Sequence, residues 1–401
     1  MSEKAIHKLS AICLSVLLTA CGGGDDAPFL QISDPAKNSG PIYDIESMCC
    51  KDSIVTGDFN NDGNIDVAAA ATKSSLEKSS GLTAILINEG NQRFRISTRL
   101  SETEHNDTLA SGDLNLDGID DLVVFGEDRD ADKGILQILI AKGDGNFSKS
   151  IIMEDASNNI GDRPKTIMIR DLNRDNLPDI LRIGKFEKSI LAYIGNGEGS
   201  FESPIISEGN FGNLDAFVFG DFNEDGYEDI ITAAYDAEVF LGNGTGHYLP
   251  FDTNGDSKSS RHDLLDGVSK GDTSMASHDF DNDGHLDLVI SSSSNSNVRF
   301  LKGKGNGLFE SKQSFNVGEV PQDLVIADFN VDGKMDVATA NRRTNDISIL
   351  LGHGDGMFAD AIAIDAEQSP HSLAVADFDN NGFPDVVVLS NDIVFIMNPS
   401  K

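Results

Sequence analysis

The stretch DFNNDGNID, residues 58–66, places three aspartates and three asparagines in nine positions. Side chains this acidic repel one another, so a compensating partner is expected. Nearly the same nine residues return as DLNLDGIDD at 113, DLNRDNLPD at 171, DFNEDGYED at 221, DFDNDGHLD at 279, DFNVDGKMD at 328 and DFDNNGFPD at 377. The intervals of 49 to 58 residues indicate an array of repeated supersecondary units.

Each unit has the same internal order. A short apolar strand leads into the acidic loop, two further apolar strands follow, and a Gly-rich turn ending in an aromatic residue precedes an outer strand. Strands of five to six residues joined by Gly-rich turns are typical of all-β proteins. We therefore predict a seven-bladed β-propeller of four-stranded antiparallel blades, with an open β-solenoid as the alternative.

The seventh unit ends at IVFIMNPSK, residues 393–401, after its third strand. The missing outer strand is expected from the N-terminal side of the chain. Either FLQIS, residues 29–33, or IYDIES, residues 42–47, can supply it. Such a closed ring leaves only short, protected strand edges.

The acidic loops, numbered 1 to 7 in chain order, carry oxygen ligands at positions 1, 3, 5 and 9, with Gly usually at position 6. This spacing curls a chain around a hard cation, and the carbonyl of position 7 points inward. The predicted ligands are Asp58, Asn60, Asp62, Asn64 and Asp66; Asp113, Asn115, Asp117, Ile119 and Asp121; Asp171, Asn173, Asp175, Leu177 and Asp179; Asp221, Asn223, Asp225, Tyr227 and Asp229; Asp279, Asp281, Asp283, His285 and Asp287; Asp328, Asn330, Asp332, Lys334 and Asp336; Asp377, Asp379, Asn381, Phe383 and Asp385.

An all-oxygen set favours Ca²⁺ over transition metals, and Mg²⁺ demands tighter octahedral geometry. We expect up to seven structural Ca²⁺ ions, each in a β-hairpin loop. Four carboxylates predict the tightest binding at loop 5, whereas Asn176 in loop 3 and Asn381 in loop 7 predict the weakest. The alternative is a set of acidic turns held by Asx hydrogen bonds without metal.

The pattern D-x-[ND]-x-D-G-x-x-D, followed by turns such as LLGHGDGMF, resembles the FG-GAP/VCBS repeat of integrin α-subunit propellers. The resemblance covers about residues 50 to 398. It implies the propeller fold and calcium binding but not a particular ligand, because folds of this kind host many functions.

The chain has 31 basic and 66 acidic residues, a formal net charge of −35. This acidity argues against nucleic acid and anionic membrane surfaces as partners, since both require a basic face. The hydrophobic share of 39% argues against disorder.

Residues 1–20 have a charged start and a short apolar stretch, which predict an export signal. LTAC resembles the bacterial lipobox, which implies lipidation of Cys21 and a flexible tether over 21–28, before a propeller over 29–401. An ordinary signal peptide is the alternative. Gly22 in place of Asp favours the outer membrane by the same resemblance. The adjacent Cys49 and Cys50 either form a vicinal disulfide, cross-link two chains, or remain free thiols.

No HExxH motif, strand–turn–helix nucleophile elbow or P-loop is predicted. We expect a lipid-anchored, non-enzymatic binding, adhesion or scaffold module for a protein or polysaccharide. The alternative is a carbohydrate-active enzyme of lyase type with its site at the channel mouth. The face opposite the acidic loops gathers candidate ligand contacts, namely His105, Arg129, Arg163, Lys185, Arg342, Arg343 and His371. Solvated loops with exposed arginines are the simpler explanation.

Overall fold

A computed structural model of the chain describes residues 39–43, 50–73, 80–100, 105–128, 133–148, 151–154, 164–184, 189–208, 214, 216–233, 237–251, 271–366, 368–390 and 392–398. The predicted signal segment 1–20, Cys21, the tether 21–28 and residues 29–33 lie outside these ranges. Cys49 also lies outside them, and of Cys50 only the backbone is described.

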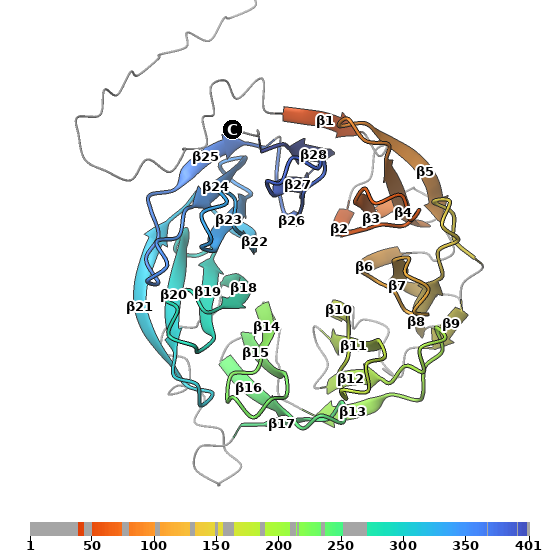
Figure 1. The fold of residues 1–401 in the computed structure, drawn as a ribbon, viewed down its shortest axis with the longest axis horizontal. Helices are drawn as coiled ribbons and strands as arrows, with labels where there is room; N and C mark the ends of the chain where they lie inside the picture. Colours follow the sequence, from red (N-terminus) through yellow and green to blue (C-terminus); the bar gives the residue numbers. More distant parts are fainter. Residues whose placement is uncertain are drawn as a thin grey trace, which may run out of the picture.

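Seven antiparallel four-stranded sheets form a closed ring, which confirms the predicted β-propeller (Figure 1). Blade 1 contains β2 (Cys50–Gly57), β3 (Asp66–Lys73), β4 (Ser80–Asn88) and β5 (Phe94–Leu100). Blade 2 contains β6 (His105–Gly112), β7 (Asp121–Asp128), β8 (Lys133–Leu139) and β9 (Ile151–Glu154). Blade 3 contains β10 (Pro164–Arg170), β11 (Asp179–Gly184), β12 (Ser189–Tyr193) and β13 (Ile205–Glu208).

Blade 4 contains β14 (Ala216–Gly220), β15 (Asp229–Ala233), β16 (Ala237–Gly242) and β17 (Tyr248–Pro250). Blade 5 contains β18 (Asp272–His278), β19 (Asp287–Ser292), β20 (Asn297–Gly303) and β21 (Phe309–Asn316). Blade 6 contains β22 (Pro321–Ala327), β23 (Asp336–Asn341), β24 (Asp346–Leu350) and β25 (Ile362–Asp365). Blade 7 contains β26 (Ser372–Ala376), β27 (Asp385–Leu389), β28 (Ile393–Ile396) and β1 (Ser39–Tyr43).

The core of the molecule lies between blades rather than within one sheet. Seven hydrophobic clusters each join two neighbouring blades, including blades 7 and 1. Every residue of β15 and of β27 is therefore buried, because both faces of the strand are covered. This explains why the second strand of each unit is mostly apolar on both faces instead of alternating.

Aromatic residues of several Gly-rich turns pack against the acidic loop of the preceding blade. The ring of Phe59, at position 2 of loop 1, lies 5.8 Å from Phe147 in the turn of blade 2. The pairs Phe222–Phe309 and Phe280–Phe358 repeat this contact at 5.6 Å. Tilted and edge-to-face pairs at this distance add to the stabilisation from burial alone.

Strand β1 completes blade 7 by pairing antiparallel with β28, and Ile42 lies opposite Val394. Of the two segments proposed to supply this strand, β1 overlaps the beginning of 42–47. The N-terminal part of the described chain therefore lies beside its C-terminal part on the outside of the ring (Figure 1).

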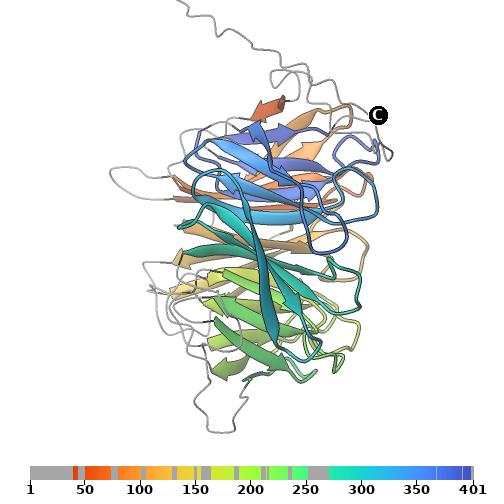
Figure 2. The ribbon, with the colours of Figure 1, turned by 90° about the vertical axis from the view of Figure 1, so that its left-hand side faces the viewer.

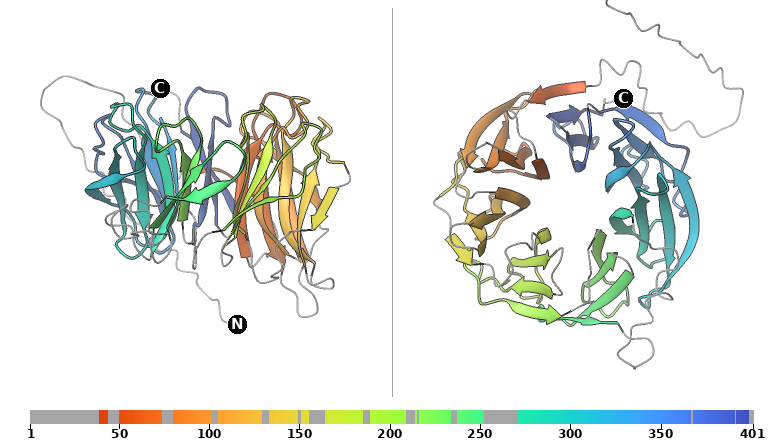
Figure 3. Two further views of the ribbon diagram at one scale, coloured as in Figure 1. Left: turned by 90° about the horizontal axis from the view of Figure 1, so that it is seen from below. Right: turned by 180° about the vertical axis from the view of Figure 1, so that it is seen from behind.

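The side views show a disc whose connections project from two faces (Figures 2 and 3). Because strands alternate in direction, the acidic loops and the Gly-rich turns share one face, here called the loop face. Connections from the second to the third strand, and from blade to blade, lie on the opposite face. Among the described residues, no helix has the length and apolar character needed to cross a bilayer.

Candidate metal centre

The acidic loops adopt one backbone conformation that wraps around the first aspartate. In loop 1 the carboxylate of Asp58 accepts the N–H of Asp62 at 3.1 Å and that of Gly63 at 2.9 Å. The bond to position 6 recurs in all seven loops at 2.7–3.0 Å. The glycines at this position have φ between 84° and 92°, as the predicted sharp bend requires.

Positions 3 and 5 are linked side chain to side chain. Asn60 donates from Nδ2 to Asp62 Oδ2 at 2.9 Å and accepts the Asp62 N–H at 3.0 Å. Loops 2, 3, 4 and 6 repeat the Nδ2 bond at 2.9–3.3 Å. These are the Asx hydrogen bonds of the metal-free alternative, yet each carboxylate keeps lone pairs for a cation, since it offers about four acceptor sites.

The aspartate at position 9 is fully buried in every loop. One oxygen of Asp66 accepts the N–H of Phe59 at 3.0 Å, and the other accepts that of Asn88 at 2.7 Å. The second bond recurs in all blades at 2.6–3.0 Å and reaches the residue at or just beyond the end of the third strand. Position 9 therefore joins the loop, the second strand and the third strand, a role that the spacing alone did not predict.

Burial dominates the titration of these aspartates. It raises the pKa of Asp66, Asp336 and Asp385 to about 7, despite the two backbone donors that favour the charged form. The pKa of Asp121, Asp229 and Asp287 is raised to about 6 for the same reason. A nearby divalent cation would favour the charged form of all six.

Two buried carboxylate oxygens at predicted ligand positions have no hydrogen-bond partner, Asp221 Oδ1 and Asp281 Oδ1. Such an oxygen is costly to bury unless a cation or water satisfies it. Three carboxylates also lie within 4.8 Å of one another in loop 5 and again in loop 7. Outside loop 5, where Lys302 also contacts the carboxylates, the donors are all oxygen, and the residues of the loops fit a calcium ion.

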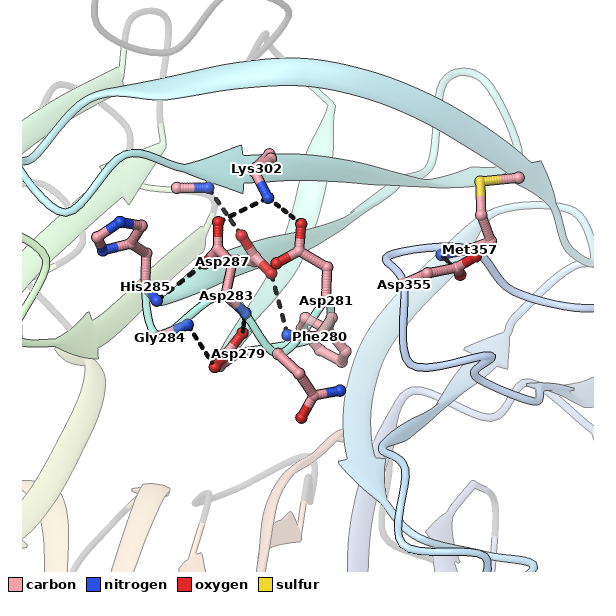
Figure 4. Close-up of polar contacts among 12 residues, drawn as sticks. Asp279, Phe280, Asp281, Asp283, Gly284, His285, Asp287, Lys302, Asp355 and Met357 are labelled. Atoms are coloured by element: carbon pink, nitrogen blue, oxygen red, sulfur yellow. Dashed lines mark hydrogen bonds and ion pairs between the residues drawn. The ribbon is translucent and has the colours of Figure 1, made fainter.

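Loop 5 contains a contact that the sequence analysis missed (Figure 4). Lys302 on β20 places its Nζ 2.6 Å from Asp283 Oδ2 and also in hydrogen-bond contact with Asp281 Oδ2. The hydrogen bonds that Lys302 donates to these two carboxylates raise its pKa. The signal was present in the sequence, because this position in the third strand is apolar in every other blade.

The two loops with substitutions keep the bend. Asn176 in loop 3 has φ of 64°, so it adopts the left-handed conformation expected of it. In loop 7, Asn381 donates from Nδ2 to the carbonyl of Asn398 at 2.8 Å, and its Oδ1 accepts the N–H of Phe383. Both polar atoms of the Asn381 side chain thus form hydrogen bonds with the backbone. The weak metal binding expected of loop 7 remains a prediction.

The described part of the chain includes the side chains of three residues of the predicted ligand face. Arg342 Nε donates to Ser369 Oγ at 3.3 Å, and His371 Nδ1 lies 3.1 Å from the Ser369 carbonyl. Arg343 is exposed and pairs with Glu319 at 3.1 Å. On the face opposite the acidic loops, Arg342 and His371 thus meet at the connection between blades 6 and 7, whereas Arg343 contacts the connection between blades 5 and 6. The side chain of His105 and the residues Arg129, Arg163 and Lys185 lie outside the described part of the chain.

A cleft of about 520 Å³ lies along the outer strands of blades 5 and 6. Polar groups dominate its lining, including the exposed Ser314, Asn316 and Asp360. At one end it reaches Gly318 and Asp346, next to Glu319 and its partner Arg343. The cleft thus adjoins the described part of the ligand face.

The FG-GAP-like repeat family matches residues 58–124, 113–182, 171–232, 279–339 and 328–388. These segments begin at the acidic loops and span most of the chain, so this protein belongs to the FG-GAP-like repeat family. No curated protein sequence matches the chain.

Several solved structures share the fold. An Agrocybe aegerita lectin that recognises non-reducing terminal N-acetylglucosamine is 19% identical, with a TM-score of 0.56, over 80% of this chain and 82% of the lectin. BBS1N, solved in complex with ARL6DN, is 8% identical with a TM-score of 0.57 over 90% and 96%. The periplasmic gluconolactonase PpgL of Pseudomonas aeruginosa is 13% identical with a TM-score of 0.54 over 78% and 85%. At these identities the likeness shows the fold alone.

Proposed function

We propose that this FG-GAP-like propeller is a calcium-stabilised binding module, anchored to the cell envelope by a lipid on Cys21, that presents a ligand surface without catalysing a reaction. The observation that carries the calcium part is the buried, unpartnered Asp221 Oδ1 within a loop whose other ligands are all oxygen. Such loops fold around Ca²⁺, and binding to the folded state alone would stabilise the protein.

The charge balance supports the same conclusion. The whole chain has a formal net charge of −35, and all seven acidic loops lie on the loop face, so their carboxylates add to the repulsion there. Each Ca²⁺ would neutralise two of these charges. Metal is therefore proposed to act structurally, with positions 1, 3, 5 and 9 as side-chain ligands and position 7 as a carbonyl ligand.

A luminescence experiment tests the calcium sites. The chain has five tyrosines and no tryptophan, and Tyr227 lies at position 7 of loop 4. Tb³⁺ bound there should be excited through Tyr227, and Ca²⁺ should displace it. Tyr227→Phe is the control, because it removes the sensitiser but keeps the backbone carbonyl. Unchanged emission on adding Ca²⁺, together with an unchanged melting temperature in chelator, would refute the calcium sites.

The proposed ligand surface is the cleft along blades 5 and 6 together with Arg342 and Arg343. Exposed hydroxyl, amide and carboxylate groups in the cleft suit the hydroxyl groups of a saccharide. The Agrocybe lectin provides a propeller that recognises terminal N-acetylglucosamine, so glycans with this end group belong among the probes. A protein ligand is the other class to test.

The calcium-loaded protein would be incubated with a panel of acidic and neutral polysaccharides, and both retention and new chain ends would be measured. Retention that is lost in Asn316→Ala or Asp360→Ala supports the cleft. His353→Ala is the control, because His353 is exposed in a Gly-rich turn on the loop face and lies outside the proposed metal ligands. Formation of new chain ends would show that the polysaccharide is cleaved, which would favour the lyase alternative over the binding module.

A further inference from the structure

Lys302 is the one lysine at its place in the repeat. In every blade, this place immediately precedes the residue whose backbone N–H donates a hydrogen bond to the aspartate at position 9. In the other six blades this place holds Ile87, Ile140, Ile194, Leu241, Leu351 and Met397. These six side chains are apolar, so none of them can place a charge in the acidic loop.

Loop 5 also has an unusual residue at position 3. Five of the other loops have asparagine there, and its amide donates to the carboxylate at position 5. Loop 5 has Asp281 instead, which cannot donate when ionised, so two carboxylates face each other. Lys302 Nζ bridges them, at 2.6 Å from Asp283 and in contact with Asp281 (Figure 4).

We infer that the ammonium group of Lys302 takes the place of calcium in blade 5, so that loop 5 is closed by a cation belonging to the chain itself. This inference rests on the proposed calcium binding of the other loops. It reverses the order expected from counting carboxylates, which makes loop 5 the tightest calcium site.

The ammonium group and a calcium ion would compete for the same carboxylate oxygens. A tethered cation has a high local concentration and does not diffuse away. Calcium requires six to eight oxygen ligands, and Lys302 engages oxygens of both Asp281 and Asp283. Asp281 Oδ1 has no hydrogen-bond partner, but a calcium ion bound there would lie beside the ammonium group and be repelled by it. A calcium ion entering the loop would also have to displace the ammonium group.

Lys334 in loop 6 provides a comparison within the chain. It is more exposed than Lys302 and reaches only Asp332, at 3.7 Å. It lies at position 7 of its own loop, where the backbone carbonyl is the expected ligand. The lysine of loop 6 therefore does not bridge the side chains at positions 3 and 5, whereas Lys302 does bridge them in loop 5.

The test is the number of calcium ions bound by the full chain, measured by native mass spectrometry and calorimetry. Lys302→Met, which copies Met397 of blade 7, should bind one more ion than the wild type. The double variant Asp281→Asn, Lys302→Leu copies the pattern of the other loops and should also gain one. It remains informative if Lys302→Met fails to fold.

Stability in chelator gives a second readout. Lys302→Met should melt at a lower temperature than the wild type in chelator and recover with calcium, because loop 5 has become calcium-dependent. The same ion count in all three proteins would overturn the inference, with calcium binding itself intact. No calcium bound by any of the three would instead refute the proposed calcium sites.

Discussion

Asp66 accepts the backbone N–H of Asn88 at 2.7 Å, and this bond ties the end of loop 1 to the end of β4. Asp66 is fully buried and also accepts the Phe59 N–H. The ninth residue of the repeat is therefore a structural connector within the blade, in addition to any contact with metal.

Replacing this connector should destabilise the protein even without metal. Asp66→Asn places an amide against a backbone N–H and leaves a buried donor unsatisfied, at a cost of about 1–3 kcal/mol. Asp62→Asn is the matched control, because Asp62 is exposed and its Oδ1 acceptor is retained. Chemical denaturation in chelator should separate the two variants; equal stabilities there would show that position 9 acts only through metal.

The stability of the calcium-free protein should rise on mild acidification. The pKa of Asp66, Asp336 and Asp385 is raised to about 7 in the folded state by burial, whereas aspartate in an unfolded chain titrates near about 3.9. Between these values the folded state binds more protons, so the free energy of unfolding falls as pH rises. Acidification from about pH 7.5 to about pH 5.5 should therefore raise the melting temperature in chelator.

The calcium-loaded protein is the comparison for this pH series. Calcium requires deprotonated ligands, so acid weakens its binding and should not stabilise that form. A chelated protein that loses stability over the same pH range would contradict the raised pKa values.

The repeat pattern allowed the fold to be predicted because seven copies repeat one order of strands and turns. The pattern did not reveal features that depend on three-dimensional contact. The double hydrogen bonding of Asp66 requires the end of β4 to lie beside the loop. Lys302 is 19 residues beyond Asp283 in the sequence, and only strand pairing brings the two together.

Position 4 of the loops shows a second feature that the motif conceals. It has positive φ in all seven loops, and loops 1, 5 and 7 have asparagine there, the residue suited to it. Loop 6 has Val331 with φ of 55°, a strained conformation for a β-branched residue. Motif analysis treats this position as variable, because its side chain is not a ligand.

Relief of this strain should stabilise the protein. Val331 is 49% exposed, so little packing is lost on replacement. Val331→Asn should raise the free energy of unfolding by about 1 kcal/mol, since the left-handed conformation costs a β-branched residue at least that much. Val325→Asn, in β22 of the same blade, is the control and should destabilise. A loss of stability in Val331→Asn would mean that the conformation of loop 6 is not strained.

Closure of the ring should depend on β1. Its removal leaves β28 as an exposed edge over the buried Ile393 and Val394. Each backbone hydrogen bond lost costs about 1 kcal/mol, and an unprotected edge strand promotes association between chains. A chain beginning at residue 44 should therefore melt earlier and self-associate in light scattering, whereas a chain beginning at residue 36 should match the parent. If the shorter chain remains monomeric with an unchanged melting temperature, β1 is dispensable for closure.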